Sequence, residues 1–121
     1  MLNGLGGSGD FARNAWLTIF LCPSVSAGGK ISKIVPFCSH IDHTEHDVDV
    51  IVTEHGAADL RNLSPRERAG EIIRKCADPG YRELLNDYRK RAESGKGHEP
   101  HILREALSWH VNLAEKGSMQ P

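Results

Sequence analysis

The sequence predicts an α/β fold: a small sheet of about three or more strands, followed by C-terminal helices that pack on it. Three short apolar segments come first, at residues 16–22, 31–38 and 50–53. After Gly56 the apolar residues recur with a helical period near 3.6 instead of a strand period of 2. Strands followed by helices indicate a sheet with helices packed on it and polar loops at one end.

The first strand is expected at residues 16–22, after a short helical turn at residues 11–15. The segment WLTIFLC is apolar apart from Thr18, as in a strand that is covered on both faces. Pro23 ends it, and the sequence AGGK at 27–30 predicts a turn.

Two further strands are expected on either side of a polar loop at 39–49. In the segment 31–38, Pro36 makes the end an edge or a bulge, because proline cannot donate to a ladder. The segment 50–53, which we expect to start at Val48, is apolar and leads into Glu54, His55 and Gly56, where the glycine suggests a sharp exit.

The first main helix has a clear beginning at Ser64. This serine is a predicted N-cap, Pro65 suits the first helical position, and Glu67 completes a capping box. One face of the helix is apolar, at Ala69, Ile72, Ile73 and Cys76. The sequence DPG at 78–80 is expected to end the helix.

Two more helices are expected after residue 80. The second has an apolar side made of Tyr81, Leu84, Leu85, Tyr88 and Ala92. After a linker at 94–97, the third is expected to open near Pro100, to close at Gly117, and to place these residues toward a partner surface: Leu103, Ala106, Leu107, His110 and Leu113. We therefore divide the chain into a domain at 1–93 and a helical extension at 94–121.

Composition excludes several classes of protein. A net charge of −1 over 121 residues gives no support for binding to nucleic acid or to an anionic membrane. The longest apolar run is far too short to cross a bilayer, and we find no secretory signal. The three cysteines, Cys22, Cys38 and Cys76, form no CxxC pair, which favours a reduced compartment such as the cytoplasm, or the mitochondrial matrix in a eukaryote.

The glycine-rich stretch at 4–9, closed by Asp10, is the first candidate site. Backbone N–H groups that face one way can hold an anion or an oxyanion formed during a reaction. The alternative is a flexible linker, but a linker would not normally run directly into an apolar segment. The pattern G-x-G-x-x-G at Gly4, Gly6 and Gly9 only formally matches a dinucleotide-binding site, because a strand, not a helix, is expected soon after it and no acid follows before Ile41.

Two other polar stretches are candidate sites. His40, His43 and His46 lie three residues apart with two carboxylates between them, and zinc accepts such ligands. Their spacing fits no standard zinc pattern, so we favour a solvated polar loop and predict no metal site. Glu54 lies at the end of an apolar strand, at a sheet rim where ligands gather in α/β proteins; the alternative is an ordinary carboxylate at a strand end.

Several ordered motifs together resemble one family. They are GGSGDF at 6–11, GKISKIVP at 29–36, DVDVIVTEHG at 47–56, ADLR at 58–61 and RERA at 66–69. In this order they resemble the C-terminal domain of the acetyl-CoA hydrolase/transferase family, which includes succinyl-CoA:acetate CoA-transferase. The resemblance runs from about Gly4 to Arg91, and GHEPH at 97–101 and SWH at 108–110 are similar to its succinate/acetate branch.

The resemblance implies a partial CoA-transferase-type domain and a covalent mechanism. In this family a glutamate attacks the acyl-CoA, and a glutamyl-CoA thioester follows. It implies that the amide of Gly7 donates to the tetrahedral oxyanion and that Glu54 is a second active-site carboxylate facing the nucleophile. Gly6, Ser8, Gly9 and Asp10 are then expected to shape the loop that binds substrate or CoA.

The resemblance also implies what this chain lacks. The family's nucleophilic glutamate lies upstream of the glycine stretch, and no carboxylate precedes Asp10. We therefore expect a C-terminal fragment that is inactive alone, has the N-terminal half of the enzyme as its partner, and forms a homodimer at full length. Coenzyme A is expected as a substrate, with no permanently bound cofactor. The residues are compatible with a transferase, with a hydrolase and, as the alternative, with a non-catalytic module that binds acyl-CoA or another anion.

Overall fold

The structure is a computed structural model that describes residues 6–121. The first two positions of the glycine-rich stretch, Gly4 and Leu5, lie outside the described residues. Five strands, four α-helices and one 3-10 helix follow one another among the described residues. In chain order they are α1 (Gly6–Asn14), β1 (Ile19–Leu21), β2 (Val25–Ser26), β3 (Ile31–Ser32), η1 (Glu45–Asp47), β4 (Val50–Thr53), β5 (Gly56–Asp59), α2 (Pro65–Cys76), α3 (Pro79–Glu93) and α4 (Ser108–Lys116).

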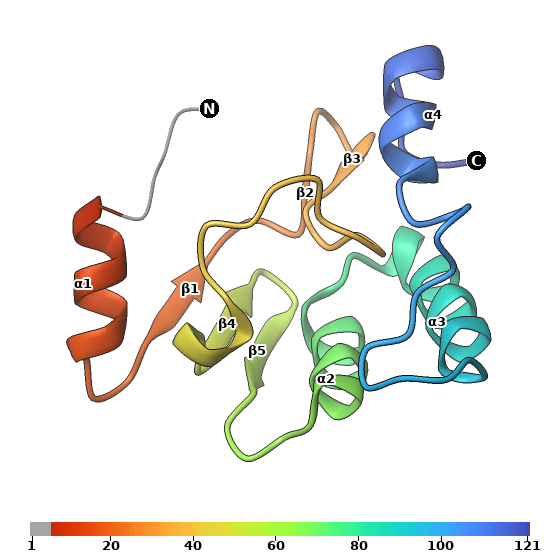
Figure 1. The fold of residues 1–121 in the computed structure, drawn as a ribbon. Coiled ribbons are helices and arrows are strands. Elements are labelled where there is room, and N and C mark those ends of the chain that lie inside the picture. Colours follow the sequence, from red (N-terminus) through yellow and green to blue (C-terminus); the bar gives the residue numbers. More distant parts are fainter. Residues whose placement is uncertain (1–5) are drawn as a thin grey trace.

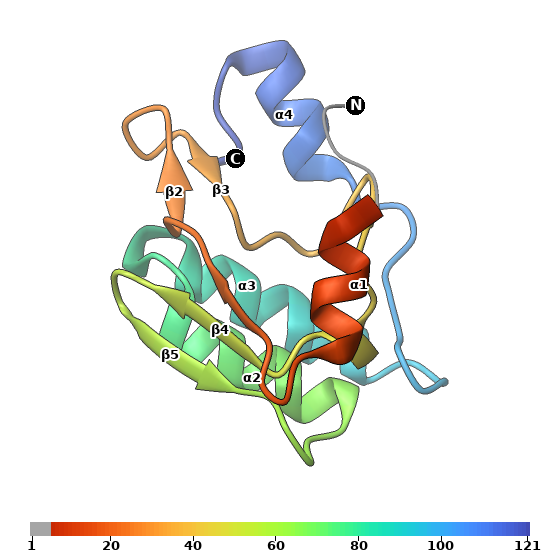
Figure 2. The same cartoon turned by 90° about the vertical axis from the view of Figure 1, so that its left-hand side faces the viewer.

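The main sheet has three strands in the order β1-β4-β5. β1 pairs with β4 in parallel, with Phe20 opposite Ile51, whereas β4 and β5 form an antiparallel hairpin in which Thr53 lies opposite Gly56. β2 and β3 form a separate two-stranded hairpin. Helix α2 packs on β4 and β5, and α3 packs on α2. Both helices lie behind the β4–β5 hairpin in Figure 2.

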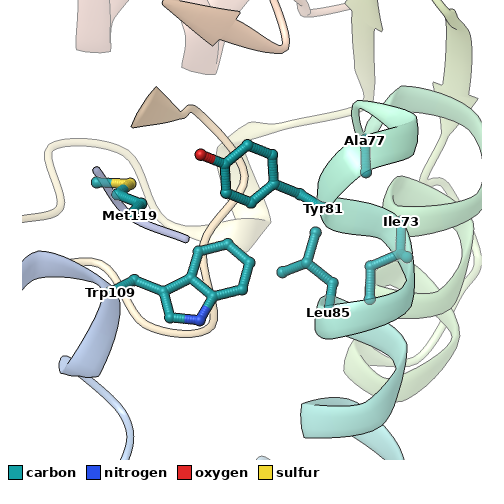
Figure 3. Packing of buried hydrophobic residues seen from close by; sticks show 6 residues of the cluster. All are labelled: Ile73, Ala77, Tyr81, Leu85, Trp109 and Met119. Atoms are coloured by element: carbon teal, nitrogen blue, oxygen red, sulfur yellow. The ribbon is translucent and has the colours of Figure 1, made fainter. Parts of the chain in front are cut away.

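The main core joins the two long helices to the C-terminal segment. Tyr81 and Leu85 of α3 pack with Trp109 of α4 and with Met119, as Figure 3 shows. The amide of Met119 donates to the carbonyl of Lys30 (2.8 Å), which ties the C-terminus to the β2–β3 hairpin. A second cluster, made of Ala58, Leu60 and Cys76, lies between the sheet and α2.

The predicted α/β class is confirmed, and so are the boundaries of the central helices. Ser64 caps α2 in a full capping box with Glu67, and Pro65 is the first helical residue. Asp78 both follows the end of α2 and caps α3, since its side chain accepts from the amide of Gly80. Gly117 ends α4 in the left-handed region with φ of 74°.

The predicted first strand differs most from the structure. Only Ile19–Leu21 pairs, and two of its three residues are exposed, so the prediction of a strand covered on both faces is wrong for the described residues. Trp16, placed in that strand by the sequence, is 92% exposed. The reason is position: β1 is an edge strand, so among the described residues only β4 pairs with it.

Other boundaries also differ. The strand expected at 31–38 ends at Ser32, whose hydroxyl donates to the carbonyl of Ile34 (2.6 Å) and turns the chain. The third helix begins at Ser108, not near Pro100, because residues 103–107 form turns instead. Leu103 is therefore 83% exposed, whereas Ala106 is buried and Leu113 packs on the main core as predicted, next to Trp109, which the prediction did not place on that face. Strands β2 and β5 were not predicted.

No helix in the described part of the chain is both long and apolar enough to span a bilayer.

Candidate active site

The glycine-rich stretch forms a helix where the sequence predicted a loop. Helix α1 begins at Gly6, where φ is +30°, and runs to Asn14, so the helical turn expected at 11–15 is longer and starts earlier. Two contacts of Asp10 support it: Arg13 donates to its carboxylate (3.3 Å) and Asn14 donates to its carbonyl (2.8 Å). The amides of the first turn of a helix have no partner inside the helix, so a helical start still presents N–H donors.

Gly7 lies in this first turn at an open surface. A Cβ atom added at Gly7 would meet nothing within 4 Å, so the site has room for another molecule. Gly7, Asp10 and Phe11 line an open hollow along α1 with Asn14 and Ala15. Gly9 is different, because it is buried and an added Cβ would lie 3.1 Å from the Arg13 guanidinium. The stretch predicted to be an anion-binding loop is thus the N-terminal end of a helix, and the surface at Gly7 is open.

Ser8 connects α1 to the histidine-rich loop. Its Oγ lies 3.1 Å from Nε2 of His43, whose ring packs on Phe20 with 5.2 Å between centroids. The other two histidines contact acids within the loop, His40 at 2.9 Å from Asp42 and His46 at 3.9 Å from Glu45. Across residues 6–121, no group of three or more such side chains is arranged to hold a metal ion.

Glu54 lies in the tight turn between β4 and β5, at the rim predicted from the sequence. Its carboxylate accepts two hydrogen bonds from Ser24, from the amide to Oε2 (2.8 Å) and from the hydroxyl to Oε1 (2.6 Å). The Glu54 side chain is nevertheless 47% exposed, so part of the carboxylate edge faces outward. The Ser24 hydroxyl, then the Ser24 amide, lowers the pKa of Glu54 to about 2. Glu54 is therefore a fixed anion at neutral pH.

A histidine and a second acid adjoin this carboxylate. Nε2 of His55 lies 3.6 Å from Oε1 of Glu54 and 3.6 Å from Oδ2 of Asp78. Asp78 uses its other oxygen to cap α3. Glu54, His55 and Asp78 thus form a row along the rim, from the β4–β5 turn to the start of α3.

The sequence did not single out Ser24, although it is the principal partner of Glu54. Ser24 follows β1, Glu54 follows β4, and these strands are parallel neighbours, so their carboxyl ends meet at one edge. A polar residue after each of two apolar strands was the available signal. It could be used only once the strands were known to be adjacent and parallel.

The structure brings Glu54, His55 and Ser24 together, but it does not bring Gly7 to Glu54. The start of α1 and the β4–β5 turn lie apart in both views (Figures 1 and 2). Helix α1 contacts η1, and of its residues only Gly9 is buried. The two predicted halves of the site are therefore separate within this chain.

Comparison with known proteins gives one consistent family. The model of the acetyl-CoA hydrolase/transferase C-terminal domain matches residues 1–89. Succinyl-CoA:acetate CoA-transferase from Clostridium kluyveri is 58% identical over 99% of this chain and 22% of its own length. Acetyl-CoA hydrolase from Candida glabrata is 59% identical over 99% of the chain and 24% of its own length, and propanoyl-CoA:succinate CoA transferase from Escherichia coli is 54% identical over 98% and 24%.

Solved structures agree with this result. RipA from Yersinia pestis has a TM-score of 0.66 at 37% identity, over 74% of this chain and 22% of that one. A 4-hydroxybutyrate CoA-transferase from Porphyromonas gingivalis has a TM-score of 0.62 at 33% identity, over 73% and 23%. This chain spans about a quarter or less of these relatives. It belongs to the acetyl-CoA hydrolase/transferase family, as part of the family's C-terminal domain.

Proposed function

We propose that this chain is the C-terminal part of an enzyme that moves CoA between an acyl-CoA and a small carboxylate such as acetate or succinate. The observation that carries the proposal is identity of 54–59% over almost the whole chain to relatives named as CoA-transferases and acetyl-CoA hydrolases. Glu54, held as an outward-facing anion at the sheet rim, is the feature of the structure that suits an active site.

The proposed reaction proceeds through a glutamate in the part of the enzyme outside these 121 residues. Its carboxylate adds to the thioester carbonyl, CoA thiolate leaves, and an acyl-glutamyl anhydride forms. The thiolate then attacks the glutamyl carbonyl and expels the carboxylic acid's anion, which gives the glutamyl-CoA thioester. A second carboxylate attacks the glutamyl-CoA carbonyl and expels CoA thiolate, which gives a new anhydride; the thiolate then attacks the acyl carbonyl of this anhydride, forming the new acyl-CoA and regenerating the glutamate. In a hydrolase, water attacks the glutamyl-CoA thioester instead and releases CoA and the free glutamate.

Glu54 suits a supporting role better than the role of nucleophile. Both of its oxygens already accept hydrogen bonds from Ser24, and its pKa of about 2 marks a weakly basic carboxylate. A weak base is a poor nucleophile, but a fixed negative charge can orient and stabilise positive or polar groups in the transition state. We assign Glu54 a positional and electrostatic role opposite the attacking glutamate.

Gly7 is the proposed oxyanion donor. Its amide is in the first turn of α1, where helix amides lack internal partners, and a Cβ atom added at Gly7 would meet nothing within 4 Å. Helix α1 is almost wholly exposed in this chain, and a short helix of this kind is marginal without packing. We propose that docking of α1 against the rest of the enzyme brings Gly7 to the same site as Glu54.

The N-terminal part of the enzyme is the proposed partner. Exposed apolar side chains lie on α1, on β1 and in the segment between them, namely Phe11, Trp16, Ile19 and Leu21. They adjoin the free edge of β1, a parallel strand, and parallel strands are normally covered on both faces. We propose that this face packs against that part of the enzyme, as an exposed apolar patch of this kind marks an interface.

The test uses a chimera in which this chain replaces the matching region of the Clostridium kluyveri enzyme. At 58% identity over 99% of the chain, most residues of the exchanged region are the same in the two proteins. The chimera should transfer CoA from succinyl-CoA to acetate. Trapping with borohydride after incubation with acyl-CoA, followed by intact-mass measurement, should show the reduced glutamyl thioester. A folded chimera without transfer or adduct refutes the proposal.

Gly7→Val in that chimera should lower kcat by about a hundredfold, because added bulk moves the acyl oxygen away from its donor. A Cβ atom added at Gly7 meets nothing within 4 Å in this chain, so the thermal unfolding temperature of the 121-residue chain with Gly7→Val should change little. Gly7→Ala, with a smaller side chain, should give an intermediate loss. An unchanged kcat for Gly7→Val would rule out Gly7 as the donor.

The 121-residue chain by itself should show no turnover with succinyl-CoA and acetate. The proposed nucleophile is outside it, and Glu54 is too weakly basic to replace that residue. Thiol release and acetyl-CoA formation, followed by chromatography, measure this directly. Enzyme-like rates from the chain alone would overturn the assignment of the nucleophile.

A further inference from the structure

Ser24 donates two hydrogen bonds to Glu54, one of the proposed site residues. It is fully buried, and both of its donors go to Glu54, one to each carboxylate oxygen. Its own carbonyl accepts from the amide of Lys33 (2.8 Å), so its backbone is anchored to the residue that directly follows β3. Two donors from one immobile residue fix the plane of a carboxylate as well as its charge.

We propose that Ser24 is a positioning residue that holds Glu54 in one orientation as a permanent anion, with its exposed edge toward the substrate. This inference rests on the proposed function, because it gives Glu54 a purpose in the reaction. Without Ser24, a glutamate side chain that is about half exposed would sample several rotamers, and its charge would face the substrate only part of the time.

The surroundings of Glu54 support this role for Ser24 over the other neighbours. His55 lies 3.6 Å from Glu54, beyond hydrogen-bond distance, and is shared with Asp78. The Cys22 thiol also interacts with Glu54: its pKa is raised mainly by burial, then by Cys76 and Glu54, and Lys33 lowers it. Ser24 is the largest cause of the lowered pKa of Glu54, and His55 is the smallest. Loss of the Ser24 hydroxyl should therefore raise the pKa of Glu54 toward its ordinary range.

The test compares two buried serines in the chimera described above. Ser24→Ala removes the hydroxyl from Glu54. Ser32→Ala removes an equally buried hydroxyl that donates to the carbonyl of Ile34, and it leaves Glu54 untouched. Ser24→Ala should lower kcat about tenfold or more, since a hydrogen bond to a charged group is lost. KM for succinyl-CoA should change less than kcat.

The pH profile separates positioning from simple support of the fold. In Ser24→Ala the acid limb of kcat should move to higher pH, because Glu54 protonates more easily. Ser24→Thr keeps a hydroxyl, so the acid limb of its kcat profile should lie at the same pH as in the unsubstituted chimera. The acid limb of Ser32→Ala should also lie at that pH. If Ser24→Ala does not fold, Ser24→Cys fills the same space with a weaker donor and should move the limb in the same direction.

Glu54→Gln distinguishes failure of this inference from failure of the proposed function. If Glu54→Gln leaves kcat unchanged, Glu54 has no role in the reaction, and both proposals for it fall. If Glu54→Gln lowers kcat but Ser24→Ala behaves like Ser32→Ala in kcat and in pH profile, Ser24 is structural only and this inference alone is overturned.

Discussion

Two carboxylates beside the same hairpin show how a neighbour decides what a residue can do. Arg61 holds the pKa of Asp59 at about 2, and Ser24 does the same for Glu54. Arg61 neutralises Asp59 through paired contacts of 2.9 and 2.7 Å. Ser24 is uncharged, so the negative charge of Glu54 stays available to a ligand. The same direction of pKa shift therefore accompanies a surface ion pair in one case and a candidate site anion in the other.

The capping box at α2 gives a prediction at the scale of one residue. Ser64→Ala removes the oxygen that accepts from the amide of Glu67 and the hydroxyl that donates to its carboxylate (2.6 Å). It should lower the free energy of unfolding by about 1 kcal/mol, measured by urea denaturation. Ser39→Ala, at an exposed loop position, is the control and should change it by less than about 0.5 kcal/mol. An equal loss in both variants would contradict a capping role.

Elements in this chain differ sharply in how they are held. Helices α2 and α3 are capped at their starts and packed on each other, and α4 is joined to the main core by Trp109 and Leu113. Helix α1 and strand β1 expose most of their surface. Exposed apolar residues on an element indicate that another protein surface covers them. For this reason we propose the partner interface on α1 and β1.

Trp109 gives the prediction at the scale of an element. Its ring packs on Tyr81 with 5.3 Å between centroids and joins α4 to the main core. Trp109→Ala should lower the free energy of unfolding by about 3–5 kcal/mol and increase hydrogen exchange across α4. Val111→Ala, in the same helix but half exposed, should change it by less than about 0.5 kcal/mol. A small effect of Trp109→Ala would mean that other contacts fix α4.

For the whole molecule, lowered carboxyl pKa values predict its acid sensitivity. The pKa values of Glu54 and Asp59 fall to about 2, and those of Glu67 and Glu71 are also lowered, by Ser64 and by Lys75 respectively. A group with a lowered folded-state pKa adds stability above its unfolded pKa and loses that stability as pH falls through the folded value.

The unfolding temperature of the 121-residue chain should therefore be nearly constant from pH 7 to about pH 5 and fall between about pH 4.5 and pH 2. Circular dichroism during heating at a series of pH values measures this. Replacing Asp59 with Asn should make the acid-side fall shallower. A chain whose stability rises on acidification below pH 4.5 would contradict the assigned contacts.

Local chemistry allowed the central part of the fold to be predicted from the sequence. The capping box at Ser64, the break at Asp78 and the end at Gly117 depend on hydrogen bonds or dihedral angles within a few residues, and all three are confirmed. The turn at 27–30 is also local, with Ala27, Gly28 and Gly29 all at positive φ. Such features carry their physical cause in the sequence itself.

The sequence alone also determined the family and the position of Glu54 at a sheet rim, because ordered motifs and strand ends can be read along the chain. The tertiary structure decided that β1 is an exposed edge strand, that α1 begins among the glycines, and that Trp109 fixes α4. It alone placed Ser24 beside Glu54, thirty positions away in the sequence. The physical reason is that a long-range contact depends on which strands become neighbours, and no residue encodes its neighbour strand locally.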